Sequence, residues 1–452
     1  MINSVQNVGP DGQGPQQLRR RDLFSYGLMA LPLAFAGLPI YLHAPDFYAG
    51  TLGQSLTSLG ILLLALRAVD AIQDPLIGSL SDRYHQHRTL FLVLGVMMLG
   101  GGFWMLFHPR LSTPLAWFAM AVFICTTGFS IVSINLQTLG GIWQVSEHQR
   151  TRITSWREAL GLLGLLTAAM GPALLGANSD PSTAFHRLTI AYLPLLAVAT
   201  WALLAWMKTA PLAQPQETFK PSGGKPSGDA VGKARGSWRA LIRNPWRCRF
   251  FALFALNTLA SAIPAVLVLF FIRDRLGAAE YSGLFLLVYF LFGALAMPLW
   301  QWLSKRVGKI QSWAVSMALS IITFLWAVFL KDGQIEAYAL VCALSGLALG
   351  ADLALPPSIL ADHIATGKSQ AEASRMFSLM TLLSKASLAL ATGLALPLLG
   401  LAGYQPGIAM TAELNLTLSL SYAALPCVLK TITLVWLLCQ ANHSAQATSL
   451  KA

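Results

Sequence analysis

The chain has 452 residues, of which 55% are hydrophobic and only 11% are charged. In a soluble domain roughly a quarter of the residues are charged, so this composition excludes a soluble protein: too few charges remain to cover a surface in water. The five cysteines are odd in number and form no CxxC pair, which argues against a secreted disulfide scaffold and against a zinc site.

Twelve apolar runs follow one another along the chain, and each approaches the roughly 20 residues that a helix needs to cross a bilayer. They lie near residues 23–43, 55–80, 89–108, 114–137, 157–177, 186–207, 249–272, 281–303, 309–330, 336–361, 376–400 and 415–440. The pattern predicts an all-α polytopic membrane protein with 12 transmembrane helices in two six-helix bundles, a common plan for transporters.

A polar stretch rich in Pro, Gly, Ser and Lys separates the two sets of six runs and predicts a solvated linker. Arg19–Arg21 precede a long apolar run without a clear cleavage site, so we expect an uncleaved first helix rather than a signal peptide. The predicted domains are a disordered tail at 1–22, a bundle at 23–207, a cytoplasmic linker at 208–247, a second bundle at 248–441 and a tail at 442–452.

The basic residues predict the orientation in the membrane. If residue 1 starts in the cytoplasm, 22 Lys and Arg residues fall in inside segments and five fall in outside loops. By the positive-inside rule, both termini and the linker are expected in the cytoplasm. The basic residues of the inside segments account for most of the net charge of +12, so no nucleic-acid partner is expected.

Charges inside the apolar runs are the most informative polar residues, because each costs about 2.5–3.5 kcal/mol near the bilayer centre. Arg67, Asp70 and Asp74 lie at i, i+3 and i+7 on one helical face, with Gln73 beside them. Two close carboxylates repel unless a proton or a cation neutralises them, and an all-oxygen set suits sodium. In the alternative interpretation, Arg67 and Asp70 form a static ion pair that only ties helices together.

A glycine and charged residues follow this run at the predicted cytoplasmic end. Gly78 permits close helix contact, and Asp82, Arg83 and Arg88 are candidate gating residues that bridge to a neighbouring helix end in one state and release it in another. A similar loop after the eighth run favours an internal repeat. Taken alone, either loop is also explained as a charged anchor on the inside face.

Two motifs carry a resemblance to known families. The pattern Gly78…Asp82-Arg83…Arg88 resembles the loop signature of the major facilitator superfamily. Arg67-xx-Asp70-Ala-xx-Asp74-Pro75-xx-Gly78 resembles the glycoside-pentoside-hexuronide:cation symporter family, of the melibiose-permease type, and the run Gly350–Asp362 followed by Arg375 and Lys385 is similar to its tenth and eleventh helices. The resemblance implies the major facilitator fold and cation-coupled symport of a small organic solute, of sugar or glycoside type, by alternating access.

The resemblance also implies site residues. The coupling ion is expected to bind at Asp70, Gln73 and Asp74. If the ion is Na⁺ rather than H⁺, Asp70 and Asp74 are its expected metal ligands. Gln73 stands where sodium-using members of the family often have Asn. A fourth-helix contribution is expected near Val132 or Ser133. The expected substrate-binding residues are Asn135, Arg157, Lys385 and Asp352. Other interpretations stay open: Arg157 snorkels to the surface, and Asp352 caps a helix or pairs with Lys385. Lys430 is the weakest candidate among the interior charges.

Two departures from the family pattern bear on the cargo. The first helix has no sugar-binding carboxylate, and Asn135 replaces an aspartate of the fourth helix. A polyol without these acceptors leaves hydroxyls unpaired at a cost of about 1–3 kcal/mol each. Transport of an amphiphilic or anionic substrate such as a lysolipid is therefore the alternative function, with Arg157 or Lys385 holding a phosphate or carboxylate.

The distant alternative is a membrane-embedded enzyme acting on lipid. All eight histidines lie near loops without HxxxH spacing, and no nucleophile and base pair stands out, so an enzyme is not expected. The expected partners are a small organic solute, a coupling cation and membrane lipid, with no cofactor beyond that ion. The expected location is the bacterial inner membrane, and the protein is expected to be monomeric.

Overall fold

The computed structural model describes residues 18–110, 112–175, 180–213, 238–366, 370–401 and 411–449. These ranges are almost entirely helical, and the β interaction that they contain is a single bridge between Trp143 and Leu212. Most of the predicted N-terminal tail and much of the predicted linker, 1–17 and 214–237, lie outside the described residues.

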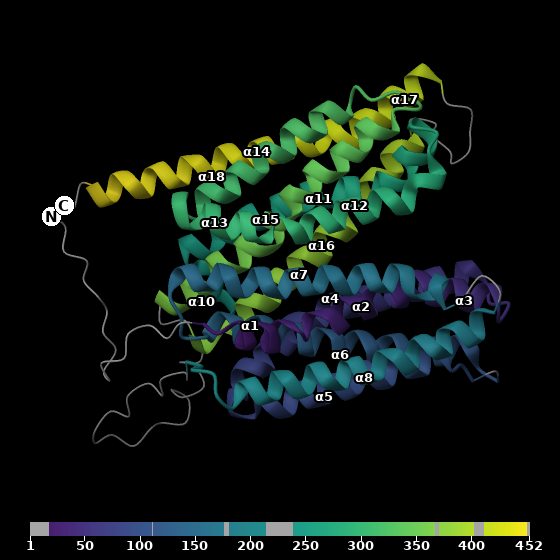
Figure 1. Cartoon of the computed structure of the whole chain (residues 1–452), viewed down its shortest axis with the longest axis horizontal. Helices are drawn as coiled ribbons and strands as arrows, with labels where there is room; N and C mark the ends of the chain where they lie inside the picture. Colours follow the sequence, from purple (N-terminus) through teal and green to yellow (C-terminus); the bar gives the residue numbers. More distant parts are fainter. Residues whose placement is uncertain are drawn as a thin grey trace.

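The first bundle contains eight α-helices and two short helical turns (Figure 1). They are α1 Arg20–Gly27, α2 Ala30–Leu38, η1 Pro39–His43, α3 Ala44–Gly50, α4 Leu56–Arg83, η2 His85–His87, α5 Arg88–Phe107, α6 Pro114–Ile142, α7 Glu147–Leu174 and α8 Pro181–Met207. The first predicted span is interrupted by a π-helical turn that begins at Pro39, because proline cannot donate the backbone hydrogen bond of a regular α-helix. Because α1 begins at Arg20, the predicted tail at 1–22 ends slightly too late.

The second bundle begins after the linker. Its elements are α10 Trp238–Arg243, α11 Pro245–Phe270, η3 Phe271–Arg275, η4 Ala279–Tyr281, α12 Ser282–Leu295, α13 Met297–Val307, α14 Lys309–Ala327, α15 Ile335–Thr366, η5 Gln370–Glu372, α16 Ala373–Leu401, α17 Ala412–Ser419, η6 Leu420–Ala424 and α18 Leu425–Ser449. The predicted eighth span bends by 42° between Leu295 and Met297, next to a proline in the first turn of α13. α18 continues to Ser449, past the predicted boundary at 441.

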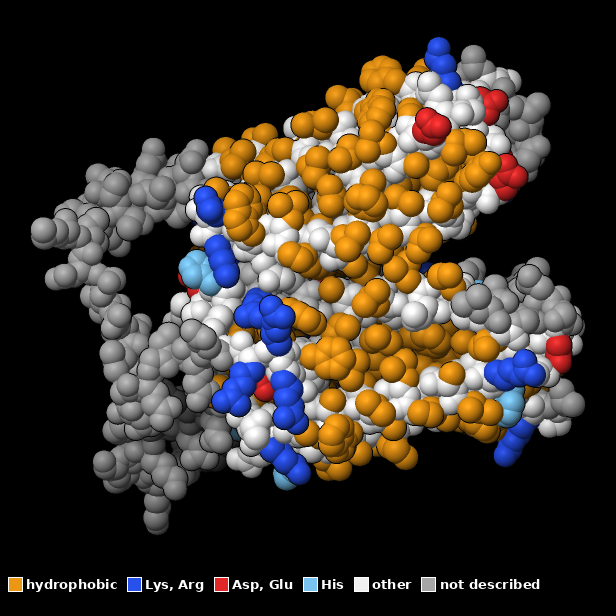
Figure 2. Space-filling view, viewed as in Figure 1, with side chains coloured by type: hydrophobic (Ala, Val, Ile, Leu, Met, Phe, Trp, Pro, Cys, Tyr) orange, Lys and Arg blue, Asp and Glu red, His pale blue; other side chains and the backbone are white. Residues whose placement is uncertain are grey.

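Within the described residues, nine helices are long and apolar enough to cross a membrane, or ten if the bent α12–α13 pair is one span. This criterion does not confirm the predicted count of twelve. α4 and α7 have 28 residues each, so at about 1.5 Å per residue they are also long enough to cross. Large apolar side chains cover the outer faces of both bundles, and the charged side chains in this view gather towards the two ends of the molecule (Figure 2). An apolar outer surface of this kind is suited to contact with the hydrocarbon tails of lipids.

The two bundles touch along α4, α6 and α7 of the first and α12, α13, α15 and α16 of the second. They lie close together at the end of the molecule where α1 begins and α10 lies, here called the α1–α10 end (Figure 1). They diverge towards the opposite end, the α3–α17 end, where a hollow separates them (Figure 2). The interface between the bundles is therefore closed at one end and open at the other.

Gly78 lies where α4 passes very close to α16. A Cβ atom at this position would lie 2.3 Å from Ser378 Oγ and 2.9 Å from the Ser374 carbonyl oxygen. Both distances are well inside van der Waals contact, and the second atom is backbone that cannot rotate away. Only a residue without a side chain lets the two helices cross here.

We predict that Gly78→Ala separates α4 from α16 at the α1–α10 end and lowers stability by about 1–3 kcal/mol, because the added methyl group overpacks the crossing. Thermal denaturation of the purified protein measures the loss. The matched control is Gly101→Ala on α5, where a Cβ meets no atom within 4 Å. Equal melting temperatures for the two variants would contradict the prediction.

Candidate functional site

A lysine from one bundle lies between two aspartates from the other. Lys385 Nζ on α16 is 2.7 Å from Asp70 Oδ2 and 2.8 Å from Asp74 Oδ2 on α4. The Asp74 side chain is fully buried, and the side chains of Asp70 and Lys385 are 7% and 24% exposed. The structure thus joins the two bundles through three charges at their interface.

Hydroxyl and amide groups complete the surroundings of these charges. Ser130 Oγ on α6 donates to Asp70 Oδ1 at 3.1 Å and accepts from Lys385 Nζ at 3.0 Å. Gln73 Nε2 donates to Asp70 Oδ1 at 3.0 Å, and Thr127 Oγ1 donates to Gln73 Oε1 at 3.0 Å. The predicted set of Asp70, Gln73 and Asp74 therefore does come together.

From α6, Ser130 contacts Asp70 and Lys385 and Thr127 contacts Gln73, whereas the predicted residues were Val132 or Ser133. Ser130 precedes Ser133 by three residues and so lies almost one turn away on the same side of α6. Its polar hydroxyl in an apolar run was a signal available in the sequence. The register between α4 and α6 selects Ser130 among several hydroxyls, and this register could not be predicted from the sequence.

The charge balance of this site is uneven. If both carboxylates are ionised, their charges and that of the Lys385 ammonium sum to −1, in a place that is largely shielded from water. Uncompensated charge in a buried site is costly, so an additional cation or a proton is favoured there. The carboxylates and Ser130 supply oxygen atoms only, which is the ligand type that hard cations prefer.

Arg67 does not form the static ion pair with Asp70 that was the alternative interpretation. Its guanidinium lies over the Tyr41 ring, 4.6 Å from the centroid. Among the described residues the ion-pair partner of Asp70 is Lys385. The pairing consequently runs between bundles, where a rocking motion can change it, rather than along one helix.

The predicted gating residues also meet α16. Asp82 accepts hydrogen bonds from the backbone N–H groups of Ser374 at 2.8 Å and Arg375 at 3.0 Å, and from Arg375 Nε at 3.2 Å. Arg88 Nη2 donates to Ser374 Oγ at 3.3 Å. Asp82 thus caps the first turn of α16, where a carboxylate also opposes the positive end of the helix dipole. Arg83 lies apart from this contact, over the Tyr84 ring.

A second set of contacts at the same end was not predicted. Asp362 on α15 pairs with Arg150 of α7 at 3.0 Å and with Lys309 of its own bundle. The hydroxyls of Thr151 and Ser358 bond at 3.1 Å beside this pair. The sequence did not indicate these contacts, because only the packing of α7 on α15 brings the charges together.

Asp352 pairs with Lys430, so the proposed pairing with Lys385 is wrong. Lys430 Nζ lies 2.7 Å from Asp352 Oδ2, and Trp313 Nε1 donates to Asp352 Oδ1 at 3.0 Å. Lys430 also donates to Asn257 Oδ1 at 3.0 Å. Lys430, the weakest candidate in the sequence, is therefore the partner of a predicted site residue.

The remaining two predicted substrate residues lie inside the first bundle. The Arg157 side chain is 6% exposed and forms an ion pair with Glu158, so the expectation that it snorkels to the surface is wrong. Asn135 is fully buried between α6 and α4, where its Nδ2 donates to Ser81 Oγ at 3.0 Å. The structure does not bring either residue to the cluster around Lys385.

Two helical bundles that meet at a charged interface and open at one end define the class of major facilitator transporters. The solved structure of a bacterial homologue of the iron transporter ferroportin, in an outward-facing state, has this fold and covers 93% of the chain with a TM-score of 0.67 and 16% identity. The structure of the fucose:proton symporter of E. coli covers 92% of the chain with a TM-score of 0.63 and 14% identity. The two alignments cover 99% of each of those chains. The sequence matches the MFS/sugar transport protein family over residues 23–439, and the chain belongs to this family.

Curated relatives fall into two groups. The chain is 32% identical over 147 residues to the sodium-dependent lysophosphatidylcholine symporter 1 of Gallus gallus. This alignment covers 31% of this chain and 28% of that protein. The chain is 25% identical over 286 residues to the inner membrane symporter YicJ of Escherichia coli. This alignment covers 59% of this chain and 58% of that protein. The chain thus matches less than two thirds of the length of either relative.

We predict that Asp352→Asn destabilises the protein by about 3–5 kcal/mol, because Lys430 then keeps a buried charge without its counter-charge. In the double variant Asp352→Asn, Lys430→Met most of this loss is recovered, since no buried charge remains. Thermal denaturation of both single variants and the double variant measures the coupling. Additive losses in the double variant would show that the two side chains do not interact.

Proposed function

We propose that the protein is a cation-coupled symporter that moves a small organic solute across a membrane by alternating access. The observation that carries the proposal is the net negative charge of the cluster Asp70, Asp74 and Lys385 at the interface between the bundles. A structural ion pair needs one carboxylate for one ammonium. The second carboxylate creates a demand for a cation that comes and goes.

In the proposed cycle, Na⁺ or H⁺ enters the cluster and competes with the Lys385 ammonium for the oxygens of Asp70 and Asp74. Because Lys385 is on α16 and the carboxylates are on α4, this competition changes how tightly the bundles hold each other. Cargo that binds the same arrangement is then coupled to the ion. By linkage, each raises the affinity of the other by the same factor.

The contacts at the α1–α10 end act as the gate in this proposal. Asp82 on the first turn of α16 and Asp362 with Arg150 hold that end closed, while the α3–α17 end is open. With the basic residues on the cytoplasmic side, the closed end is the cytoplasmic one and both termini are inside. Transport then requires these contacts to break as the opposite end closes.

Names of the relatives support two classes of cargo. The glycoside/cation symporter YagG and the isoprimeverose transporter point to a sugar or glycoside, and the lysophosphatidylcholine symporters point to an amphiphile. Transport without catalysis, a location in the bacterial inner membrane and a monomer surrounded by lipid are parts of the same proposal. The similarity to the E. coli inner membrane symporter supports the location.

We predict that Asp74→Asn and Asp70→Asn each abolish stabilisation of the purified protein by Na⁺ or by protons. An ion at about 100 times its dissociation constant stabilises the folded state by roughly 2.7 kcal/mol, which thermal denaturation in sodium or pH series detects without knowledge of the cargo. The control Asp332→Asn, at an exposed position, should respond as the wild type does. An unchanged ion response in both site variants would refute the proposed ion site.

We predict that Asp82→Asn opens the gate at the α1–α10 end. Loss of a charged helix cap costs about 0.5–2 kcal/mol, which shifts the balance of the two bundle arrangements by roughly 2- to 30-fold. Spin labels at the exposed positions His87 and Arg306, one on each bundle, report the change as a longer distance. A distance distribution identical to that of the parent protein would mean that Asp82 does not hold the gate.

A further inference from the structure

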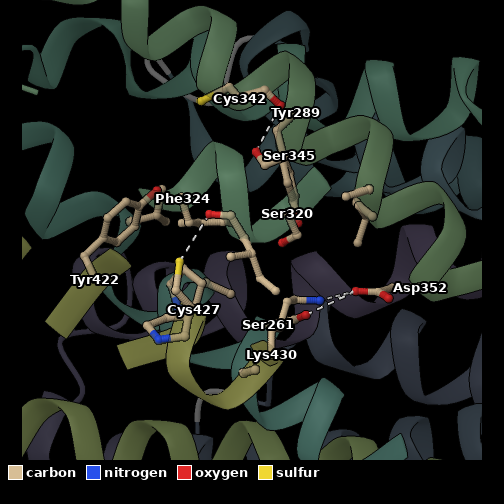
Figure 3. Close-up of a pocket in the computed structure, with 18 of the residues that line it drawn as sticks. Ser261, Tyr289, Ser320, Phe324, Cys342, Ser345, Asp352, Tyr422, Cys427 and Lys430 are labelled. Atoms are coloured by element: carbon tan, nitrogen blue, oxygen red, sulfur yellow. Dashed lines mark hydrogen bonds and ion pairs between the residues drawn. The ribbon is translucent and has the colours of Figure 1, made fainter. Parts of the chain in front are cut away.

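A cavity of about 140 Å³ lies inside the second bundle, between α11, α12, α14, α15 and the start of α18 (Figure 3). Most of its wall is apolar, with side chains such as Val268, Leu286 and Phe324. An apolar cavity of about 150 Å³ in a protein core is known to hold a ligand the size of benzene. This cavity therefore has room for a ring or for a segment of hydrocarbon chain.

Polar groups on the cavity wall are largely engaged within the protein. The hydroxyls of Tyr338 and Tyr422 bond each other at 2.7 Å, and Ser345 Oγ donates to the Val341 carbonyl oxygen at 2.7 Å. A sugar placed here would leave several hydroxyls without partners, at a cost of about 1–3 kcal/mol each. A hydrocarbon chain has no such requirement and gains from leaving water.

The charged end of the cavity does not select a charged ligand. Lys430 and Ser261 both approach Asp352 there (Figure 3). One ammonium and one carboxylate cancel, and their hydrogen bonds to Trp313, Asn257 and Ser261 satisfy them further. This end is a neutral polar wall and offers no excess charge to a phosphate or a carboxylate.

The cavity borders the interface between the bundles. Phe290 and Leu349 line it and also pack against an apolar cluster that contains Leu162 of α7 in the first bundle. On α11, which forms another wall, the Ala255 carbonyl oxygen accepts a hydrogen bond from Ser387 Oγ at 3.2 Å. Ser387 lies two residues after Lys385 on α16, so the helix that carries Lys385 packs against α11, one of the helices that line the cavity.

We propose that this cavity binds the hydrocarbon part of a single-chain amphiphilic cargo, whose polar head lies in the cleft between the bundles. The proposal rests on the proposed symport function, since it assigns a substrate class to the same transporter. It decides between the two kinds of relative in favour of an amphiphile, because the cavity offers apolar surface and few free hydrogen-bonding groups. Ser320, buried on the cavity wall, is the position at which a larger side chain would occupy this space.

The experiment measures binding of alkyl phosphocholines and alkyl glucosides of increasing chain length to the full chain in lipid nanodiscs, with empty nanodiscs correcting for partition into lipid. In the wild type each added methylene should tighten binding roughly 3- to 4-fold until the cavity is filled. Ser320→Phe should remove this chain-length dependence in both series. Ile322→Phe, on the same helix but 68% exposed, should keep it.

The outcomes separate this inference from the symport proposal. Absence of any chain-length dependence in the wild type, or full dependence in Ser320→Phe, would overturn the cavity assignment, whatever the ion response of the Asp74 variant. Chain-length dependence without any ion response would keep the assignment and overturn symport. If Ser320→Phe does not insert, Ala348→Leu on the opposite wall provides the same test with a smaller added volume.

Discussion

One ammonium group shared between two carboxylates joins the two bundles of this protein at their interface. Lys385 supplies the ammonium from α16, and Asp70 and Asp74 supply the carboxylates from α4, at distances of 2.7 and 2.8 Å. In a shielded site such an attraction is much stronger than in water, yet it leaves one negative charge unbalanced. In the proposed symport cycle, this combination of a strong attraction and an incomplete charge balance lets a small cation alter how the bundles fit together.

The same pair of helices also carries the closed contact at the α1–α10 end. Asp82 lies eight residues after Asp74 on α4, which is about 12 Å along the helix. Its partners Ser374 and Arg375 precede Lys385 on α16. A change in the separation or tilt of α4 and α16 at the cluster of Asp70, Asp74 and Lys385 therefore also acts on Asp82, which lies on the same helix beyond Pro75. No long chain of intermediate residues is required for coupling, because both contacts belong to one helix crossing that Gly78 makes close.

The sequence predicted the helical bundles and the carboxylate side of the proposed ion site, because both depend on local pattern. Apolar run length indicates a spanning helix, and the spacing of Asp70 and Asp74 places them on one helical face. The partners were harder to predict because they come from other helices. Lys385 was expected as a substrate-binding residue, and only through family resemblance, and Ser130 was missed by two or three residues. The pairing of Asp352 with Lys430 depends on how α15 packs against α18, which no spacing in the sequence records.

The two interior clusters differ in a way that assigns them different tasks. Asp352 and Lys430 balance each other, come from one bundle and have further hydrogen-bond partners, so neither gains from an added ion or from motion between bundles. Asp70, Asp74 and Lys385 do not balance and come from both bundles. A charge that is balanced within one rigid body stabilises that body, whereas an unbalanced charge shared between two bodies makes their arrangement depend on the ion. In the proposed cycle a cavity that borders this interface meets the same rearrangement, because Phe290 and Leu349 on its wall pack against the apolar cluster that contains Leu162 of the other bundle.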